Sequence, residues 1–153
     1  MTTTSSFQLT GFKELEQLLK QLPDEIAAKV LSKAFQQGAV VVRDAAKDNA
    51  PVGKTGSLKK SIKIVKPSKK VSPKASLVLI VRCKNALSHI VEYGTGPRTR
   101  ESGGSTGSMP AHPFMRPAID SHAEAAIARI KNVCSALIDH VSVDLAKRLK
   151  SIK

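Results

Sequence analysis

Apolar residues at alternating spacings of four and three run through the last third of the chain. They begin at Ile119 and continue to Leu137, after which the stripe drifts to Val141 and Leu149. This spacing predicts one long helix from about residue 117 to 149, with Pro117 in its first turn. Such a helix is roughly 50 Å long, whereas a compact domain of this length has a radius of gyration of about 15 Å. We therefore expect the helix either to break near residues 135–139 or to pack against a partner subunit.

Two more helices are predicted in the first third of the chain. A short amphipathic helix is expected between Phe12 and Leu22, because leucines recur there at helical spacing. A second helix is expected over residues 24–49. The β-preferring run Val40–Val42 competes with it, but the helical period continues on both sides. Pro51 ends this helix, since the residue before a proline avoids the α region.

Short strands are predicted in the middle of the chain. Ser61–Val65 is typical of a short strand, and Leu77–Val81 is continuously apolar, which favours a buried strand. These two segments are expected to pair as a hairpin across a lysine-rich loop centred on residues 67–73. Ser88–Tyr93 is a third candidate strand.

Residues 94–113 contain five glycines and three prolines, which favours a long exposed loop. Within it, Glu101–Ser108 is expected to become ordered only against a neighbouring molecule. The whole pattern predicts an α+β fold with N-terminal helices, a small antiparallel β-sheet with long loops, and a long C-terminal helix. We expect one domain over residues 11–150 after a flexible N-terminus, residues 1–10.

Positive charge is concentrated in one segment. The chain has a net charge of +13, and no acidic residue lies between Asp48 and Glu92. Such a segment attracts nucleic acid or an acidic protein surface. It is equally consistent with a solvated strand surface that prevents edge-to-edge aggregation. The lysines proposed for contact with DNA or an acidic partner are Lys54, Lys59, Lys60, Lys63, Lys66, Lys69, Lys70 and Lys74.

Two segments resemble motifs of nucleotide-binding or catalytic sites, but neither has the context that its motif requires. Gly53-Lys54-Thr55 lacks the first glycine of a phosphate-binding loop and follows a helix rather than a strand. Gly103–Gly107 matches the GxSxG pattern around Ser105, but without the strand and helix that expose a catalytic serine.

The histidines and cysteines do not indicate a metal site or a catalytic site either. The four histidines show no metal-ligand spacing, and Cys83 and Cys134 are expected to be buried thiols. No run of about 18 apolar residues occurs, so we expect no membrane span and a protein that is soluble in the cytoplasm when made. We expect no enzyme activity, no metal, no cofactor and no small-molecule substrate.

Three ordered pieces carry a resemblance to a known family. They are Arg43–Lys47 leading into Ala50–Ile62, then Ile90–Thr95, then Pro110–Ala118 before the long helix. In this order they resemble the tail-completion or neck-protein family of long-tailed phages, also labelled as a tail component, over about residues 10–135. The Gly/Ser-rich residues 101–108 lengthen the loop before Pro110 relative to that family.

The resemblance implies an α+β virion protein that acts in head–tail joining, usually as a homo-oligomeric ring with other neck or tail proteins. It implies assembly in the host cytoplasm and no catalytic residues. The matching positions, expected at subunit or partner interfaces, are Pro51, Gly53, Thr55, Gly56, Leu58, Ser61, Glu92, Gly94, Thr95, Pro113, Phe114, Arg116 and Pro117.

Some of these positions allow two interpretations. Gly53 and Gly56 are consistent with a bend needed for assembly or with an ordinary helix-to-strand turn. Phe114 is expected either to fill the core or to anchor in a neighbour. A non-specific nucleic-acid-binding module is the alternative function. It would make salt-sensitive phosphate contacts, because the basic segment lacks interleaved aromatic residues for base stacking.

Overall fold

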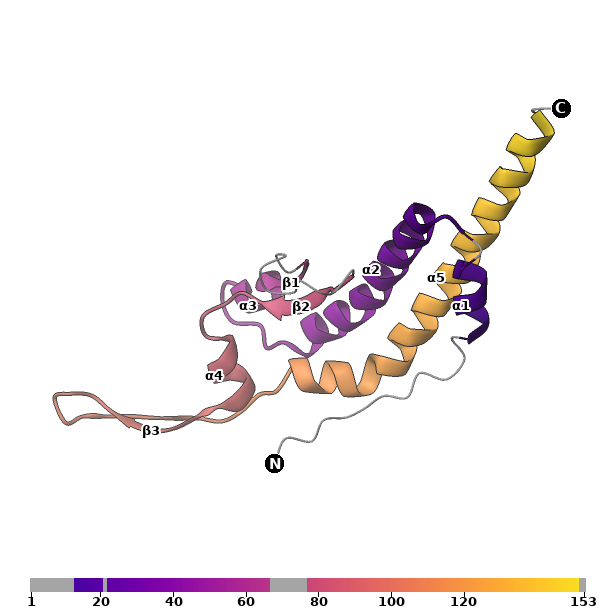
Figure 1. Ribbon diagram of the computed structural model, residues 1–153. Coiled ribbons are helices and arrows are strands. Elements are labelled where there is room, and N and C mark those ends of the chain that lie inside the picture. The colour runs from indigo at the N-terminus through magenta and orange to yellow at the C-terminus, as the bar shows by residue number, and fades with distance from the viewer. Residues whose placement is uncertain (1–12, 21, 67–76, 152–153) are drawn as a thin grey trace.

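Two long antiparallel helices form the body of the protein (Figure 1). The computed structural model describes residues 13–20, 22–66 and 77–151. The fold is α+β, as predicted. In chain order its elements are α1 (Lys13–Lys20), α2 (Asp24–Asn49), α3 (Ser57–Ser61), β1 (Ile62–Val65), β2 (Ile80–Cys83), α4 (Ser88–Tyr93), β3 (Thr95–Thr99), β4 (Ser105–Met109) and α5 (Met115–Ser151).

Close packing of α2 against α5 holds the body together. Ala34 and Cys134 are fully buried between the helices, beside Val30 and Ile138. A Cβ on Gly38 would lie only 2.5 Å from Cγ1 of Ile130, so the absence of a side chain there allows the close approach. Small residues in the middle of the contact therefore bring the two helices together.

A second core lies where the C-terminal end of α2 meets the start of α5. Phe114 is 1% exposed and Ile62 is equally buried, and both pack with Ala46, Leu58 and Val91. This core joins α2, α3, β1, α4 and the start of α5. Phe114 thus fills the core, which is the first of its two interpretations.

The two long helices agree with the sequence prediction. The predicted bounds of 24–49 are those of α2, so the Val40–Val42 run is helical. α5 begins two residues before the predicted start and continues without a break through residues 135–139. Of the two alternatives, the break does not occur, since Ile138 keeps facing the body, and packing against a partner subunit stays a prediction.

The first hairpin also forms, with a shift. β1 pairs antiparallel with β2, and Ile62 lies opposite Cys83. The second strand is Ile80–Cys83 rather than Leu77–Val81, and its alternating burial shows one solvent-facing side. The prediction of a fully buried strand was wrong because only one face of this small sheet packs on the body. The predicted loop at residues 67–73 and the N-terminus, residues 1–10, lie outside the described residues.

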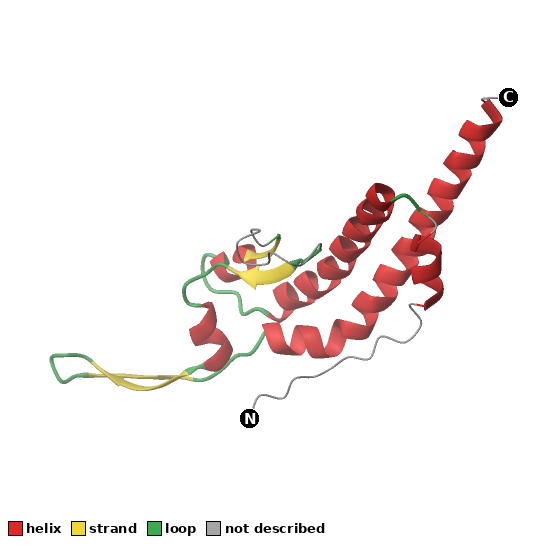
Figure 2. Ribbon diagram, in the orientation of Figure 1, coloured by secondary structure: helices red, strands yellow, loops and turns green. Residues whose placement is uncertain are grey.

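Two other predictions are corrected by the structure (Figure 2). Ser88–Tyr93 is the helix α4, not a strand. A six-residue run with apolar residues only at Ile90, Val91 and Tyr93 fits either period, and here Val91 is its one buried residue. Residues 94–113 are not a loop throughout, because β3 and β4 pair as an antiparallel hairpin. Its residues from Gly96 to Ser108 are exposed, as expected, but the backbone is regular enough to form strands.

Candidate assembly surface

Glu92 joins α4 to the start of α5. Its Oε2 accepts hydrogen bonds from the backbone N–H groups of Phe114 at 2.9 Å and Met115 at 3.0 Å, and its Oε1 accepts one from Arg116 at 3.1 Å. These are N–H groups that have no partner within the first turn of a helix. A carboxylate is also favoured there by the helix dipole. Glu92 therefore caps α5 from another element.

The electrostatics of Glu92 follow from this position. Partial burial acts most strongly and raises its pKa. The three backbone hydrogen bonds and the charge of Arg116 together outweigh burial, so the pKa lies below its ordinary value of 4.5. The carboxylate is therefore ionised at neutral pH, which is the form that accepts all three bonds.

Gly94 fixes the point where the chain leaves α4. Its φ is +71°, a conformation that side chains rarely adopt. A Cβ there would lie 2.7 Å from the carbonyl oxygen of Met109 and 2.8 Å from the nitrogen of Ala111. Next to it, Thr95 Oγ1 accepts a hydrogen bond from the N–H of Met109 at 3.1 Å. Gly94 thus allows both strands of the second hairpin to meet closely at their root.

The first motif forms the turn before α3. The N–H of Gly56 donates to the carbonyl of Gly53 at 3.0 Å, and Gly56 has a φ of +58°. Leu58 is buried in the core, and the Ser61 hydroxyl donates to the carbonyl of Leu58 at 2.7 Å. Pro51, by contrast, is exposed. The motif therefore divides into a buried part that fixes the turn and an exposed part that faces solvent.

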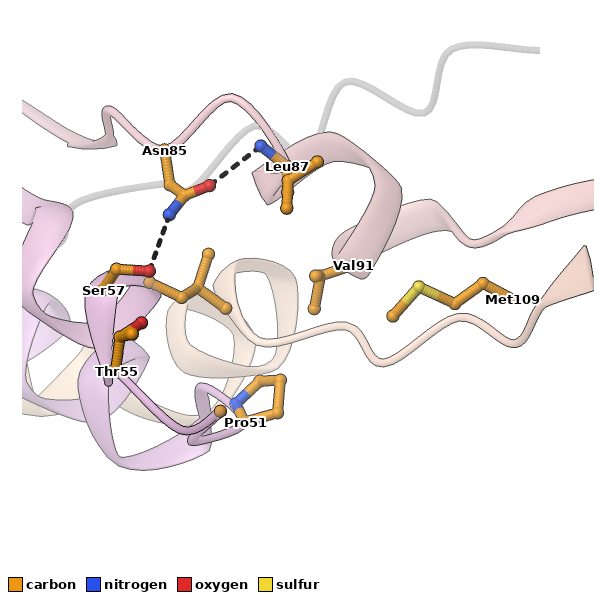
Figure 3. Close-up of a pocket in the computed structure, with 9 residues that line it drawn as sticks. Pro51, Thr55, Ser57, Asn85, Leu87, Val91 and Met109 are labelled. Carbon is orange, nitrogen blue, oxygen red and sulfur yellow. Dashed lines mark hydrogen bonds between the residues drawn. The ribbon is translucent and has the colours of Figure 1, made fainter.

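An apolar groove lies between this turn, α4 and the root of the second hairpin (Figure 3). Its volume is about 240 Å³. Asn85 spans one end, donating to Ser57 Oγ at 3.3 Å and accepting from the N–H of Leu87 at 2.9 Å. No lining residue is ionisable. The lining consists of Pro51, Gly53, Thr55, Ser57, Leu58, Asn85, Leu87, Val91 and Met109.

Large apolar side chains are exposed on the same elements. Val52 is 72% exposed, Leu87 60% and Tyr93 76%. Val52 lies on the turn that lines the groove, and Tyr93 ends α4. A groove without ionisable residues, with exposed apolar residues on the elements that form it, suits protein side chains better than an ionic small molecule.

The second hairpin extends away from the body (Figure 1). Its pairs are Thr95–Met109, Arg98–Gly107 and Thr99–Ser105, with register shifts between them. We call residues 95–109 the arm. The arm's strands contact mainly each other, and every residue from Gly96 to Ser108 is exposed.

The basic residues do not form one cluster. Lys59 is bound to Asp48, with Nζ 3.3 Å from Oδ1. Lys63 lies directly opposite Arg82 in the first hairpin. Lys54, Lys60 and Lys66 are exposed. Lys69, Lys70 and Lys74 lie outside the described residues.

The predicted interface positions thus lie on three segments: the turn before α3 with α3 itself, the end of α4 with the residues that follow it, and the start of α5 with the residues just before it. We call these segments the junction. They are not a uniformly exposed surface. Phe114 is buried, Ser61 and Pro117 are partly buried, and Pro113 and Arg116 are exposed. Among the residues that line the groove, sequence reasoning missed Ser57, Asn85, Leu87, Val91 and Met109. Asn85 carried a detectable signal, because an asparagine that accepts from the N–H two residues later forms an Asx turn, which often precedes a helix.

Comparison with known proteins gives the family. Residues 13–94, more than half of the chain, match the family described as "Bacteriophage HK97-gp10, putative tail-component". The chain belongs to this family. It is therefore a bacteriophage tail component and a virion protein. The match ends at Gly94, so the arm and α5 lie beyond it.

The other comparisons add nothing to this assignment. No curated protein matched the chain, and no solved structure did. In the part of the chain that the structure describes, no three His, Cys, Asp or Glu residues are grouped to hold a metal ion. No helix of that part is long and apolar enough to cross a membrane.

Proposed function

We propose that this chain is a structural, non-enzymatic subunit of the phage head–tail joint, where it forms a homo-oligomeric ring that completes the tail. In this proposal residues 11–150 act as one α+β unit that assembles in the host cytoplasm and remains in the virion. Its partners are copies of itself and adjoining neck or tail proteins. Membership of a tail-component family supports a structural role in the phage tail.

The arm is the observation that carries the proposal of assembly into a ring. A two-stranded hairpin is marginally stable in water when it has no other packing, and this one carries serine, threonine, glycine and arginine instead of an apolar face. Its backbone groups along the outer edges are available to pair with another chain. An element of this kind is explained if a neighbouring subunit covers it in the assembled particle.

The groove supplies a different surface on the same molecule. Ring formation requires head-to-tail contacts, in which one surface of a subunit meets another surface of the next. The arm starts beside the groove, and Met109 belongs to both. We propose that the groove and the exposed positions Pro51, Thr55, Pro113 and Arg116 contact an adjacent copy, whose own arm reaches the next one.

The C-terminal end of α5 supports assembly independently. The helix has 37 residues and is about 55 Å long at 1.5 Å per residue. In Figure 1 its last turns extend beyond the start of α2, so they receive no support from that helix. A helix end that projects in this way is suited to packing against a neighbour.

The candidate nucleophile does not have the geometry of a hydrolase. Ser105 begins the exposed strand β4, and its Oγ accepts a hydrogen bond from the N–H of Gly107 at 3.2 Å. A catalytic serine of the GxSxG type lies instead on a tight turn between a strand and a helix. This geometry, with the family assignment, supports the non-enzymatic role.

Deleting the gene from a phage that carries it tests the proposal. We expect filled heads and separate tails to accumulate, and complementation by the wild-type gene to restore joined particles. A cryo-EM map of the complemented virion should contain a ring of this chain at the joint. Normal infectious particles from the deletion phage, or a map that places the chain elsewhere, would contradict the proposal.

A further inference from the structure

The outward face of the first hairpin carries three cations in a fixed arrangement. Because side chains alternate across a strand, Ile62 and Cys83 face the core while Lys63 and Arg82 face outward. Lys84 follows Arg82 by two residues and is also exposed. Its N–H donates to the carbonyl of Ser61 at 3.2 Å, which extends the pairing by one step.

Lys63 and Arg82 are direct cross-strand neighbours. Side chains at such positions have Cβ atoms about 5 Å apart, and like charges placed there repel each other. Within the described parts of the chain, no carboxylate lies within ion-pair distance of either residue. The folded chain therefore holds two cations together without neutralising them.

The two carboxylates that bound the acid-free segment are both occupied. Asp48 is bound to Lys59, and Glu92 accepts three hydrogen bonds from the start of α5. Neither is available to Lys63, Arg82 or Lys84. An anionic partner for this face would therefore come from outside the chain.

We propose that Lys63, Arg82 and Lys84 bind the phosphate backbone of duplex DNA without sequence preference. The inference rests on the proposed function, which puts the chain on the path of the genome through the joint. A second copy of this chain is a poor partner for the face, since each copy carries a charge of +13. Bases are not read, because the described face has no aromatic residue for stacking and only one arginine. Binding gains free energy from the release of counterions from DNA.

The test is binding of the full-length protein to a fluorescent duplex of random sequence across a salt series. The variant replaces Lys63, Arg82 and Lys84 with glutamine. The matched control replaces Lys29, Lys33 and Arg129 with glutamine, which removes the same charge from exposed positions on α2 and α5. Each phosphate contact contributes about 0.9 to the slope of log K against log salt.

We expect the variant to lower the magnitude of that slope by about 3 and to weaken binding at least tenfold at low salt, since it removes three contacts. The control should keep the wild-type slope. Equal losses in both variants would show attraction by net charge alone and overturn the proposal. Absence of wild-type binding at low salt would also overturn it. In that case, loss of virion incorporation by the variant would point to an acidic protein partner instead.

The outcome is separate from that of the gene deletion. Failure to bind DNA would leave a ring at the joint intact as a proposal. A deletion phage with normal particles would remove the ring without changing the measured binding. Circular dichroism of both variants checks that they are folded.

Discussion

The helical body, formed by α2 and α5, and the arm, residues 95–109, are built on opposite principles. The body buries small residues such as Ala34 and Cys134 and allows no side chain at Gly38. The arm, between Gly96 and Ser108, exposes every residue and pairs mainly with itself. The difference indicates that the fold's stability lies in the body, while the arm is shaped for a surface outside its own chain.

The core around Phe114 connects these two regions. Glu92 fixes α4 to α5, and the N–H of His112 donates to the carbonyl of Val91 at 2.8 Å. The root of the arm is therefore held in place by the core, although the strands of the arm contact mainly each other and not the body. Substitutions in the body or the junction should cost stability, and substitutions in the arm should cost assembly.

The largest effect is expected from Phe114→Ala. Removing a side chain that is 1% exposed leaves a cavity among five elements, and we expect a loss of about 3–5 kcal/mol in the free energy of unfolding. Urea denaturation measures it. Tyr93→Ala is the control, because Tyr93 is 76% exposed and its loss should cost little. Similar losses in the free energy of unfolding from both substitutions would contradict the role of the Phe114 core in connecting the body to the arm.

Gly38→Leu should have the next largest effect. A Cβ at this position already meets Ile130 and lies 3.1 Å from the carbonyl oxygen of Ala126. Separating the helices should cost about 2 kcal/mol, since overpacking outweighs the roughly 1 kcal/mol gained in helix propensity. Gly53→Ala is the matched control, because nothing lies within 4 Å of its Cβ position. Unchanged stability of Gly38→Leu would mean that the body packs loosely.

Glu92→Gln should reduce stability by about 1 kcal/mol at neutral pH, in the range of helix-cap substitutions. The pKa of Glu92 is lowered in the folded state, so the unfolded chain binds the proton more readily. The carboxylate therefore stabilises the fold fully above pH 5 or so, and this contribution is lost as the pH falls through the folded-state pKa.

Urea denaturation of wild type and Glu92→Gln between pH 3 and 7 measures this effect. The difference in the free energy of unfolding between the two proteins should shrink toward low pH. Glu101→Gln is the control, because Glu101 is exposed at the tip of the arm. A difference between wild type and Glu92→Gln that stays constant across the range would contradict the capping role.

The sequence predicted the body better than the arm for a physical reason. The helical period persists over the 26 residues of α2, and no other secondary structure would bury the same set of apolar residues. The run at residues 88–93 was too short to distinguish a helix from a strand. The arm has no alternation of apolar and polar residues, since neither of its faces is buried.

The junction could be predicted only in part. The motif residues were found, but their roles depend on contacts across the chain. Glu92 acts on N–H groups 22 to 24 residues away, and no local pattern predicts such a cap. From the sequence, Gly94 is only an expected interface position, whereas in the structure it allows the close approach to Met109 and Ala111.

Shortening the arm tests the central claim most directly. Replacing Thr99–Thr106 with Asn-Gly, which forms a tight two-residue hairpin turn, would leave Arg98 paired with Gly107. Thermal unfolding and complementation of the deletion phage are then measured on the same variant. The account predicts a Tm within about 2 °C of wild type and a failure to yield joined particles. Full complementation by this variant, or a large fall in its Tm, would contradict the division between a stable body and a contact-making arm.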